Sequence, residues 1–79
     1  MGRRVKRIEE IDRFETKSES GKEYLIIQYQ EYLNPVSEDQ SNDEILGRKF
    51  FLTYHGALVY HIKPKTFEIF ATKEIVQKV

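Results

Sequence analysis

The chain has 79 residues, which is enough for one small domain, expected to span residues 1–79. Its 13 basic and 13 acidic residues cancel, which argues against a dedicated binder of nucleic acid or anionic membrane. There is no cysteine, so disulfides, thiolate nucleophiles and cysteine-ligated zinc are excluded. The basic N-terminus has no apolar run after it, and no stretch approaches the ~18 apolar residues of a membrane span. We therefore expect a cytoplasmic protein without a membrane partner.

Residues 1–7 are expected to form a basic, flexible N-terminus. Residues 8–16 fit a strand and also fit a short helical stripe. The strand is favoured because a polar turn containing Gly21 follows, and then residues 23–33, EYLIIQYQEYL. That stretch is rich in β-branched and aromatic residues and has no glycine or proline, so it predicts the strongest strand of the chain.

Residues 34–45 contain Pro35 and many Asn, Asp and Ser residues, which predicts a long mobile loop. Residues 46–54 and 57–62 then predict a second hairpin around His55 and Gly56. Residues 66–71 predict another strand after a turn at Pro64. Residues 74–79 fit either a strand or one helical turn, and the strand is favoured. The fold class expected is therefore mostly β, a small antiparallel sheet of five to six strands, curled or barrel-like.

A two-residue loop at His55 and Gly56 would set the register of the second hairpin, with Leu52 opposite Val59 and Phe50 opposite His61. Both faces of this hairpin are then apolar, and one of them has few residues left to cover it. That face is the predicted interaction face, and it consists of Phe50, Leu52, Tyr54, Val59 and His61.

The two histidines of the chain, His55 and His61, both follow a tyrosine in this hairpin. In the predicted register they lie about four residue pairs apart, roughly 13 Å, which is too far for one metal ion within a monomer. We interpret them as a turn histidine and a strand histidine. No metal, cofactor or catalytic group is expected, and the sequence has no nucleophile motif, so the protein is expected not to be an enzyme.

The segments GALVYHIKPKTFEIFATKE and SGKEYLIIQYQEYL resemble a pattern in a family of small uncharacterised bacterial proteins. In that pattern a glycine turn and a valine-containing strand lead through a polar turn into TFEI and then a Thr-Gly-Glu turn. Lys73 stands here where the pattern has glycine. The resemblance implies a bacterial, all-β protein, and it supplies no catalytic residues.

Two functions are consistent with these observations. The first is a non-enzymatic interaction module that binds another protein or a second copy of itself through the predicted apolar face. The alternative is a nucleic-acid-binding small β-barrel, which the zero net charge disfavours. Its predicted contacts are Arg3, Arg4, Lys6, Arg7, Lys63 and Lys65. Exposed aromatic residues beside a basic patch would favour nucleic acid, whereas an uncharged apolar patch or a paired edge strand would favour protein.

Overall fold

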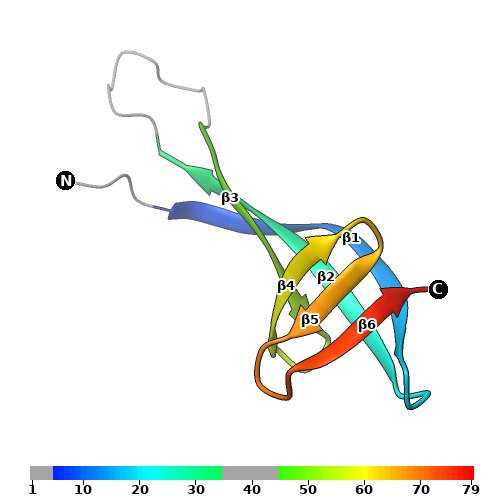
Figure 1. Cartoon of the computed structure of the whole chain (residues 1–79). Helices are drawn as coiled ribbons and strands as arrows, with labels where there is room; N and C mark the ends of the chain where they lie inside the picture. The colour runs from blue at the N-terminus through cyan, green and yellow to red at the C-terminus, as the bar shows by residue number, and fades with distance from the viewer. Residues whose placement is uncertain (1–4, 35–44) are drawn as a thin grey trace.

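The computed structural model describes residues 5–34 and 45–79, and this part of the chain contains six strands and no helix (Figure 1). Each strand pairs antiparallel with the next, and the last returns to the first, so the sheet closes into a small barrel. The predicted mostly-β, barrel-like fold class is confirmed. The strands are β1 (Val5–Ser18), β2 (Glu23–Leu33), β3 (Ile45–Thr53), β4 (Leu58–Lys63), β5 (Thr66–Ile69) and β6 (Glu74–Lys78).

The C-terminal segment is a strand, as predicted, and it closes the barrel. Val76 in β6 lies opposite Phe67 in β5 on one side and opposite Ser18 in β1 on the other. Val76 is fully buried. A helical turn in its place would leave both neighbouring strands with unpaired edges.

The core is small and lies inside the barrel. Its buried side chains come from β2, β4, β5 and β6, and Phe14, Tyr24, Phe51 and Ala57 pack against it from the rim. Such a thin core is typical of a chain of this length. The buried apolar cluster consists of Ile26, Val59, Phe67, Ile69 and Val76.

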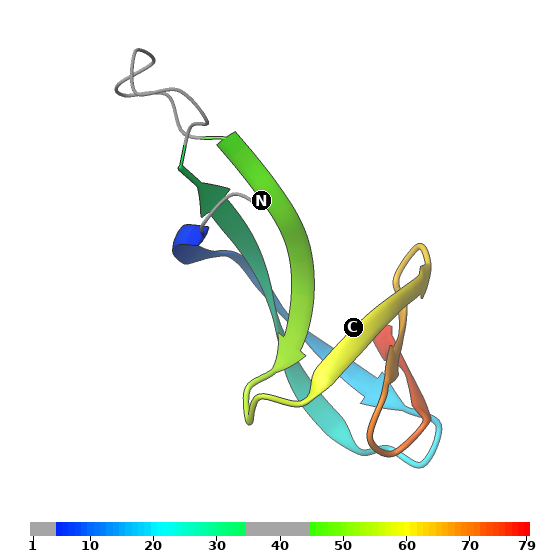
Figure 2. The same cartoon turned by 90° about the vertical axis from the view of Figure 1, so that its left-hand side faces the viewer.

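The first three strands are longer than the last three and extend past the barrel as a curved arm (Figures 1 and 2). β1 pairs with β2 from Lys17 opposite Glu23 out to Val5 opposite Leu33, and β3 follows β2 out to Ile45. The molecule is therefore elongated, with extents of 53 × 22 × 22 Å. Because β4, β5 and β6 do not follow the arm, its inner face continues the barrel interior but is covered by no other strand of the described residues.

The β1–β2 and β3–β4 hairpins have the same kind of loop. Gly21 and Gly56 have φ angles of 87° and 91°, a conformation that favours glycine. In the β1–β2 hairpin the Lys22 N–H donates to the Ser18 hydroxyl, and in the β3–β4 hairpin the Ala57 N–H donates to the Thr53 hydroxyl. Each loop therefore has three residues and ends in a left-handed glycine, which is a common alternative to the two-residue turn.

This loop length makes the predicted register of the second hairpin wrong by one residue. Phe51 lies opposite Val59, and Leu52 lies opposite Leu58. The physical reason is that Thr53 and Ala57 are bonded across the loop, with the Thr53 N–H donating to the Ala57 carbonyl at 2.8 Å. A one-residue shift moves every side chain of β4 to the opposite face relative to β3.

Two lysines occupy turns with positive φ, Lys65 at 64° and Lys73 at 62°. Lys65 follows Pro64 in the two-residue β4–β5 turn, where a type II turn requires a left-handed second residue. Lys73 takes the left-handed conformation in the turn after Ala71, although glycine adopts this conformation more readily.

The predicted mobile loop at residues 34–45 falls almost entirely outside the described residues. Asn34 directly follows β2, and Ile45 is the first residue of β3. Of the predicted flexible N-terminus, residues 1–4 lie outside the described part, whereas residues 5–7 belong to β1. Within the described ranges no helix is long or apolar enough to cross a membrane.

Candidate functional site

β3 and β4 run side by side for only two residue pairs. Phe51 opposite Val59 is the last pair counted from the hairpin loop, and beyond it the strands diverge (Figure 2). β4 turns to pair with β5, while β3 continues along β2 into the arm. Within the described residues, the stretch 45–50 of β3 therefore has a strand partner on its β2 side only.

The hydrogen bonds near the loop show which backbone groups of β3 face the gap. The Thr53 N–H donates to Ala57 across the β3–β4 hairpin, whereas the Tyr54 N–H donates to the Leu25 carbonyl of β2. Backbone groups of successive residues alternate in direction along a strand. The backbone N–H and C=O groups of Leu52 and Phe50 thus face β2, and those of Lys49 face the gap.

The same alternation applies to β4. The Leu58 carbonyl accepts from the Phe70 N–H, on the β5 side. His61, three residues further on, therefore directs its backbone groups away from β5 and toward the gap. Two diverging strands thus present unpaired edges to one another, and such edges are templates for an additional strand.

A groove of about 740 Å³ occupies this gap, and we call it the β3–β4 groove. It is lined by residues 48–52 of β3 and 58–61 of β4, together with Ile8 and Glu31. Apolar side chains from both strands form most of its wall, including Phe50, Leu52 and Leu58. A volume of this size is within the range of ordinary ligand pockets.

An aromatic cluster lies beside the groove, and it consists of Phe14, Phe51, His61 and Phe67. Two of its members, Phe51 and His61, line the groove. Phe67 is in its centre, with ring centroids 5.1 Å from Phe14, 5.1 Å from Phe51 and 4.8 Å from His61. The His61 ring is stacked on Phe67 at an interplanar angle of 22°. The rings pack against one another, and His61, the exposed member of the cluster, turns one ring face to the buried Phe67.

A second hollow of about 360 Å³ lies on the other side of Phe51 and His61, on the inner face of the arm. Its rim includes Lys65 and Lys78, and the Lys78 ammonium lies 4.7 Å from the centre of the Phe14 ring. Asp12 is the one carboxylate in its lining. The aromatic cluster therefore separates two adjoining concave surfaces.

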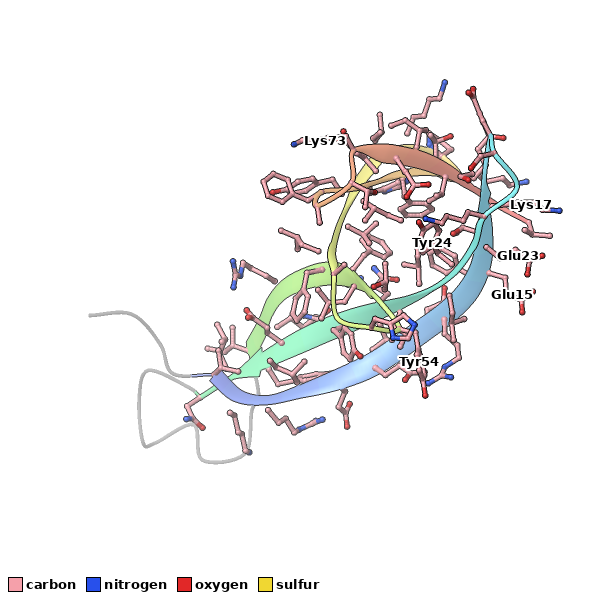
Figure 3. All side chains as sticks on the ribbon, turned by 90° about the horizontal axis from the view of Figure 1, so that it is seen from below. Glu15, Lys17, Glu23, Tyr24, Tyr54 and Lys73 are labelled. Carbon is pink, nitrogen blue, oxygen red and sulfur yellow. The ribbon has the colours of Figure 1, made fainter. Side chains whose placement is uncertain are left out.

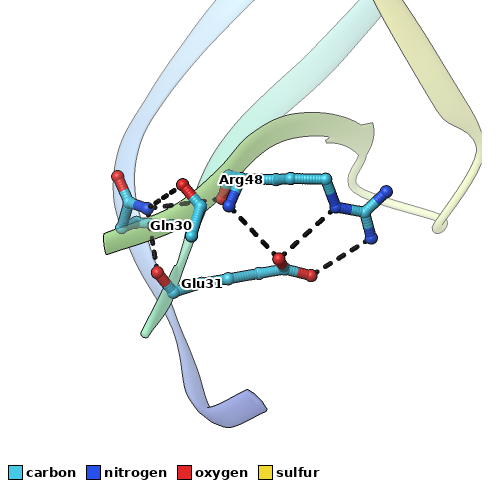
Figure 4. Close-up of polar contacts among 4 residues, drawn as sticks. Gln30, Glu31 and Arg48 are labelled. Carbon is cyan, nitrogen blue, oxygen red and sulfur yellow. Dashed lines mark hydrogen bonds and ion pairs between the residues drawn. The ribbon is translucent and has the colours of Figure 1, made fainter. Parts of the chain in front are cut away.

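A β-bulge at Gly47 and Arg48 borders the open edge of β3 (Figure 4). The buried Gln30 amide donates to the carbonyls of both bulge residues, at 3.1 and 3.3 Å. The Glu31 carboxylate accepts from the Arg48 backbone N–H at 3.2 Å and from its guanidinium at 3.2 and 3.4 Å. Side chains thus satisfy the backbone groups that the bulge removes from the ladder.

The Glu31–Arg48 pair also sets the electrostatics of the groove. Hydrogen bonding and the positive charge of the Arg48 guanidinium, together with the Arg48 backbone N–H, lower the pKa of Glu31. The same carboxylate raises the pKa of Arg48. Lys49, next along β3, is exposed and has no ion pair within the described residues. One negative and two positive charges therefore line the groove.

The register change splits the predicted interaction face. Phe50 and Leu52 share the outer face of β3, and Tyr54 is the first residue of the loop that follows. Val59 is only 3% exposed and belongs to the core, and His61 lies with the aromatic cluster instead of opposite Phe50. The reason is the three-residue loop, which places other β4 side chains on the outer face. Those are Leu58 and Tyr60, which are 40% and 46% exposed.

The outer face continues across β4 to the turn after β5. The rings of Tyr60 and Phe70 lie 5.6 Å apart and nearly perpendicular. Both are about half exposed, as is Ile62. This apolar outer surface adjoins the β3–β4 groove through Leu58 and Tyr60.

The predicted nucleic-acid contacts do not form one patch in the described structure. Arg3 and Arg4 lie outside the described residues. Arg7 lies over the Tyr32 ring at 4.0 Å and forms an ion pair with Glu9, in the arm. Lys6 is its exposed neighbour. Lys63 ends β4 and Lys65 lies in the β4–β5 turn, which both views place on a separate part of the molecule from the start of β1 (Figures 1 and 2).

The two histidines lie in different environments. His55 is exposed at the tip of the β3–β4 loop, with its ring against Tyr54 at 5.5 Å. His61 packs in the aromatic cluster. Residues 5–34 and 45–79 contain no group of three or more His, Asp or Glu side chains placed to hold a metal ion.

The end of the barrel remote from the arm is closed by a polar contact. The Tyr24 hydroxyl donates to the Glu74 carboxylate at 2.5 Å. This bond raises the pKa of Tyr24 and lowers that of Glu74. Lys17 projects away from the barrel at the same end (Figure 3). The Tyr24–Glu74 hydrogen bond joins β2 to the start of β6, so we assign it a role in holding the barrel together.

The sequence did not reveal the bulge or its partners Gln30 and Glu31. One signal was present, because Gly47 interrupts the strand pattern, and an isolated glycine there indicates a bulge. In the structure, a Cβ at this position would lie 3.0 Å from the Glu31 Cβ. A side chain at Gly47 would therefore crowd Glu31, whose carboxylate accepts from the Arg48 N–H.

Comparisons of the chain with protein-family models, with curated proteins and with solved structures found no match. The fold and the β3–β4 groove therefore stand on the geometry of this chain alone.

Proposed function

We propose that the protein is a small, non-enzymatic interaction module that binds an extended protein segment along the open edge of β3. The segment adds a strand to the sheet and fills the β3–β4 groove. Main-chain hydrogen bonds supply affinity in this mode of recognition, and side-chain pockets supply specificity.

The observation that carries the proposal is the divergence of β3 from β4 after Phe51. It leaves the backbone groups of Lys49 and His61 directed into an apolar groove. Proteins usually blunt such an edge with charged residues, with a proline or with a covering element. Here Arg48 and Lys49 are charged, yet the wall beside them is built from apolar side chains. An open backbone edge beside an apolar wall is more favourable when a partner strand covers it than when both are exposed to water.

The proposal is tested with a displayed library of random peptides of about eight residues, the length of an ordinary strand. The library is selected against the natural protein and, in parallel, against Lys49→Pro. A proline at this edge removes the N–H that faces the gap and leaves pairing with β2 intact. Peptides enriched by the natural protein should lose binding to Lys49→Pro and should shift the amide NMR signals of Lys49 and His61.

Lys49→Ala is the matched control, because it removes the same side-chain charge as Lys49→Pro and keeps the N–H, so it should weaken binding less than Lys49→Pro does. Equal binding of the selected peptides to Lys49→Pro and to the natural protein would contradict strand addition. Failure to enrich any peptide on the natural protein would contradict it too.

A further inference from the structure

The charge of the β3–β4 groove differs from that of the whole molecule. The chain carries 13 basic and 13 acidic residues, which give it no net charge. In the groove, the Glu31 carboxylate is offset by Arg48, and Lys49 adds a positive charge without an ion pair in the described structure. The side chain of Glu31 is 9% exposed, whereas that of Arg48 is 83% exposed. A ligand therefore meets the two cations more readily than the anion.

The charges of the groove are concentrated at one end, whereas apolar residues line its whole length. At the end next to the β3–β4 loop, the walls are Leu52 and Leu58. Toward the arm, Arg48 and Lys49 lie beside the apolar Phe50 and Ile8. An added strand lies parallel to this axis, with alternate side chains pointing to the two faces. The groove thus presents apolar surface along the strand and adds positive charge at the end toward the arm.

We infer that the ligand of the β3–β4 groove is an extended protein segment that is apolar at one end and acidic at the other, with its carboxylates meeting Lys49 and Arg48. This inference rests on the strand-addition function proposed above. Complementary charge of this kind selects partners and speeds association more than it adds affinity.

A second copy of the chain is a poorer occupant of this edge. Two copies joined by a two-fold axis through β3 would bring the same surface together from both sides. Lys49 and Arg48 of one copy would then face Lys49 and Arg48 of the other. Like charges opposed across paired strands are destabilising, whereas an acidic segment relieves the same charges.

Single-stranded nucleic acid is also a poorer occupant. Stacking on bases requires free aromatic faces. Among the rings that line the groove, Phe50 is stacked on Tyr29 and His61 is stacked on Phe67. Tyr60, which is 46% exposed, has its ring against that of Phe70. Nucleic acid would also leave the open backbone edge of β3 without the main-chain hydrogen bonds that a peptide strand supplies.

The composition of the peptides selected in the display experiment tests this inference directly. Peptides enriched on the natural protein should carry Asp or Glu at one end and aliphatic or aromatic residues at the other, and few should carry Lys or Arg. Binding of the selected peptides to Lys49→Gln should weaken roughly threefold to tenfold. It should also weaken as sodium chloride is raised, since exposed charges are screened. The control Lys17→Gln removes a lysine at the far end of the barrel and should leave binding unchanged.

The outcomes separate the inference from the proposed function. Selected peptides without an acidic bias would overturn the inference, and so would equal binding to Lys49→Gln. In both cases a loss of binding to Lys49→Pro would leave strand addition intact. Tighter binding of labelled oligothymidylate than of any selected peptide would overturn both proposals in favour of nucleic acid. A dimer that sedimentation shows to be disrupted by Lys49→Pro would overturn the inference in favour of self-association at this edge.

Discussion

Phe51 lies opposite Val59 at the last position where β3 and β4 run side by side. Both side chains belong to the interior, Val59 in the core and Phe51 at its rim. Beyond this pair β4 bends toward β5 to close the barrel, and β3 follows β2 into the arm. The Phe51–Val59 pair therefore defines the register of the hairpin and marks the point at which the β3–β4 groove begins.

The open edge predicts contrasting effects of proline at two adjacent positions of β3. Lys49→Pro should change the free energy of unfolding by less than about 1 kcal/mol, because its N–H faces the gap. Phe50→Pro should lower it by more than about 2 kcal/mol, because that N–H faces β2 and its loss leaves a ladder carbonyl unpaired. Urea unfolding of both variants measures the difference. Equal losses would show that Lys49 is hydrogen-bonded on its outer side.

The three-residue loop predicts a cost for a side chain at Gly56. Gly56→Ala should lower the free energy of unfolding by about 1–2 kcal/mol, because an L-residue is strained at a φ of 91°. A Cβ there would meet no atom within 4 Å, so the cost comes from the backbone conformation and not from a clash. Thermal unfolding measures it, with Gly56→Asn as the control that should lose less. A neutral Gly56→Ala would mean that Gly56 does not hold this left-handed conformation in solution.

The left-handed conformation of Lys65 predicts that glycine at this position stabilises the protein. Its φ of 64° is left-handed, and glycine adopts this conformation without steric cost. Lys65→Gly should raise the free energy of unfolding by roughly 0.5–1 kcal/mol, the relief of strain exceeding the added flexibility of the unfolded chain. Lys63→Gly, in the adjoining strand β4, should lower it instead. The account of this turn would fail if both variants were destabilised alike.

The Glu31–Arg48 pair predicts sensitivity to acid. The pKa of Glu31 is lower in the folded protein than in the unfolded chain, because Arg48 stabilises the carboxylate. Its contribution to stability is therefore complete above about pH 4.3, the ordinary value for glutamate, and is lost as the pH falls through the lower folded pKa. Unfolding measured across this range should show less pH dependence for Glu31→Gln than for the natural protein. Identical pH profiles would mean that the carboxylate is not held by Arg48 in solution.

The strands could be predicted from sequence because period-two patterns and turn residues are local signals. The hairpin at Ser18 and Gly21 and the hairpin at Thr53 and Gly56 also share a local signal, a hydroxyl residue three positions before a glycine. If this spacing is taken to indicate a three-residue loop, it predicts the observed register of both hairpins. The two-residue loop predicted at His55 and Gly56 was wrong, because Thr53 and Ala57 are hydrogen-bonded across a three-residue loop.

The groove could not be predicted in the same way, because it depends on contacts between distant residues. β4 leaves β3 because the barrel closes through β6, where Val76 meets Ser18 across 58 positions of sequence. No local pattern encodes that pairing. The charged wall depends in turn on the bulge at Gly47, which turns Glu31 toward Arg48. With the register shifted by one residue, the predicted face contained Val59 from the core and omitted Tyr60 from the surface.

Residue-resolved amide hydrogen exchange of the free protein tests the open edge of β3 most directly. The account predicts that the N–H groups of Lys49 and His61 exchange within about tenfold of an unstructured peptide, because they face the groove. The N–H groups of Phe50 and Leu52, bonded to β2, should be strongly protected, as should that of Val59. Protection of Lys49 and His61 equal to that of Phe50 and Val59 would mean that β3 and β4 are paired along their length. The groove would then not exist in solution, and the proposed strand addition would be wrong.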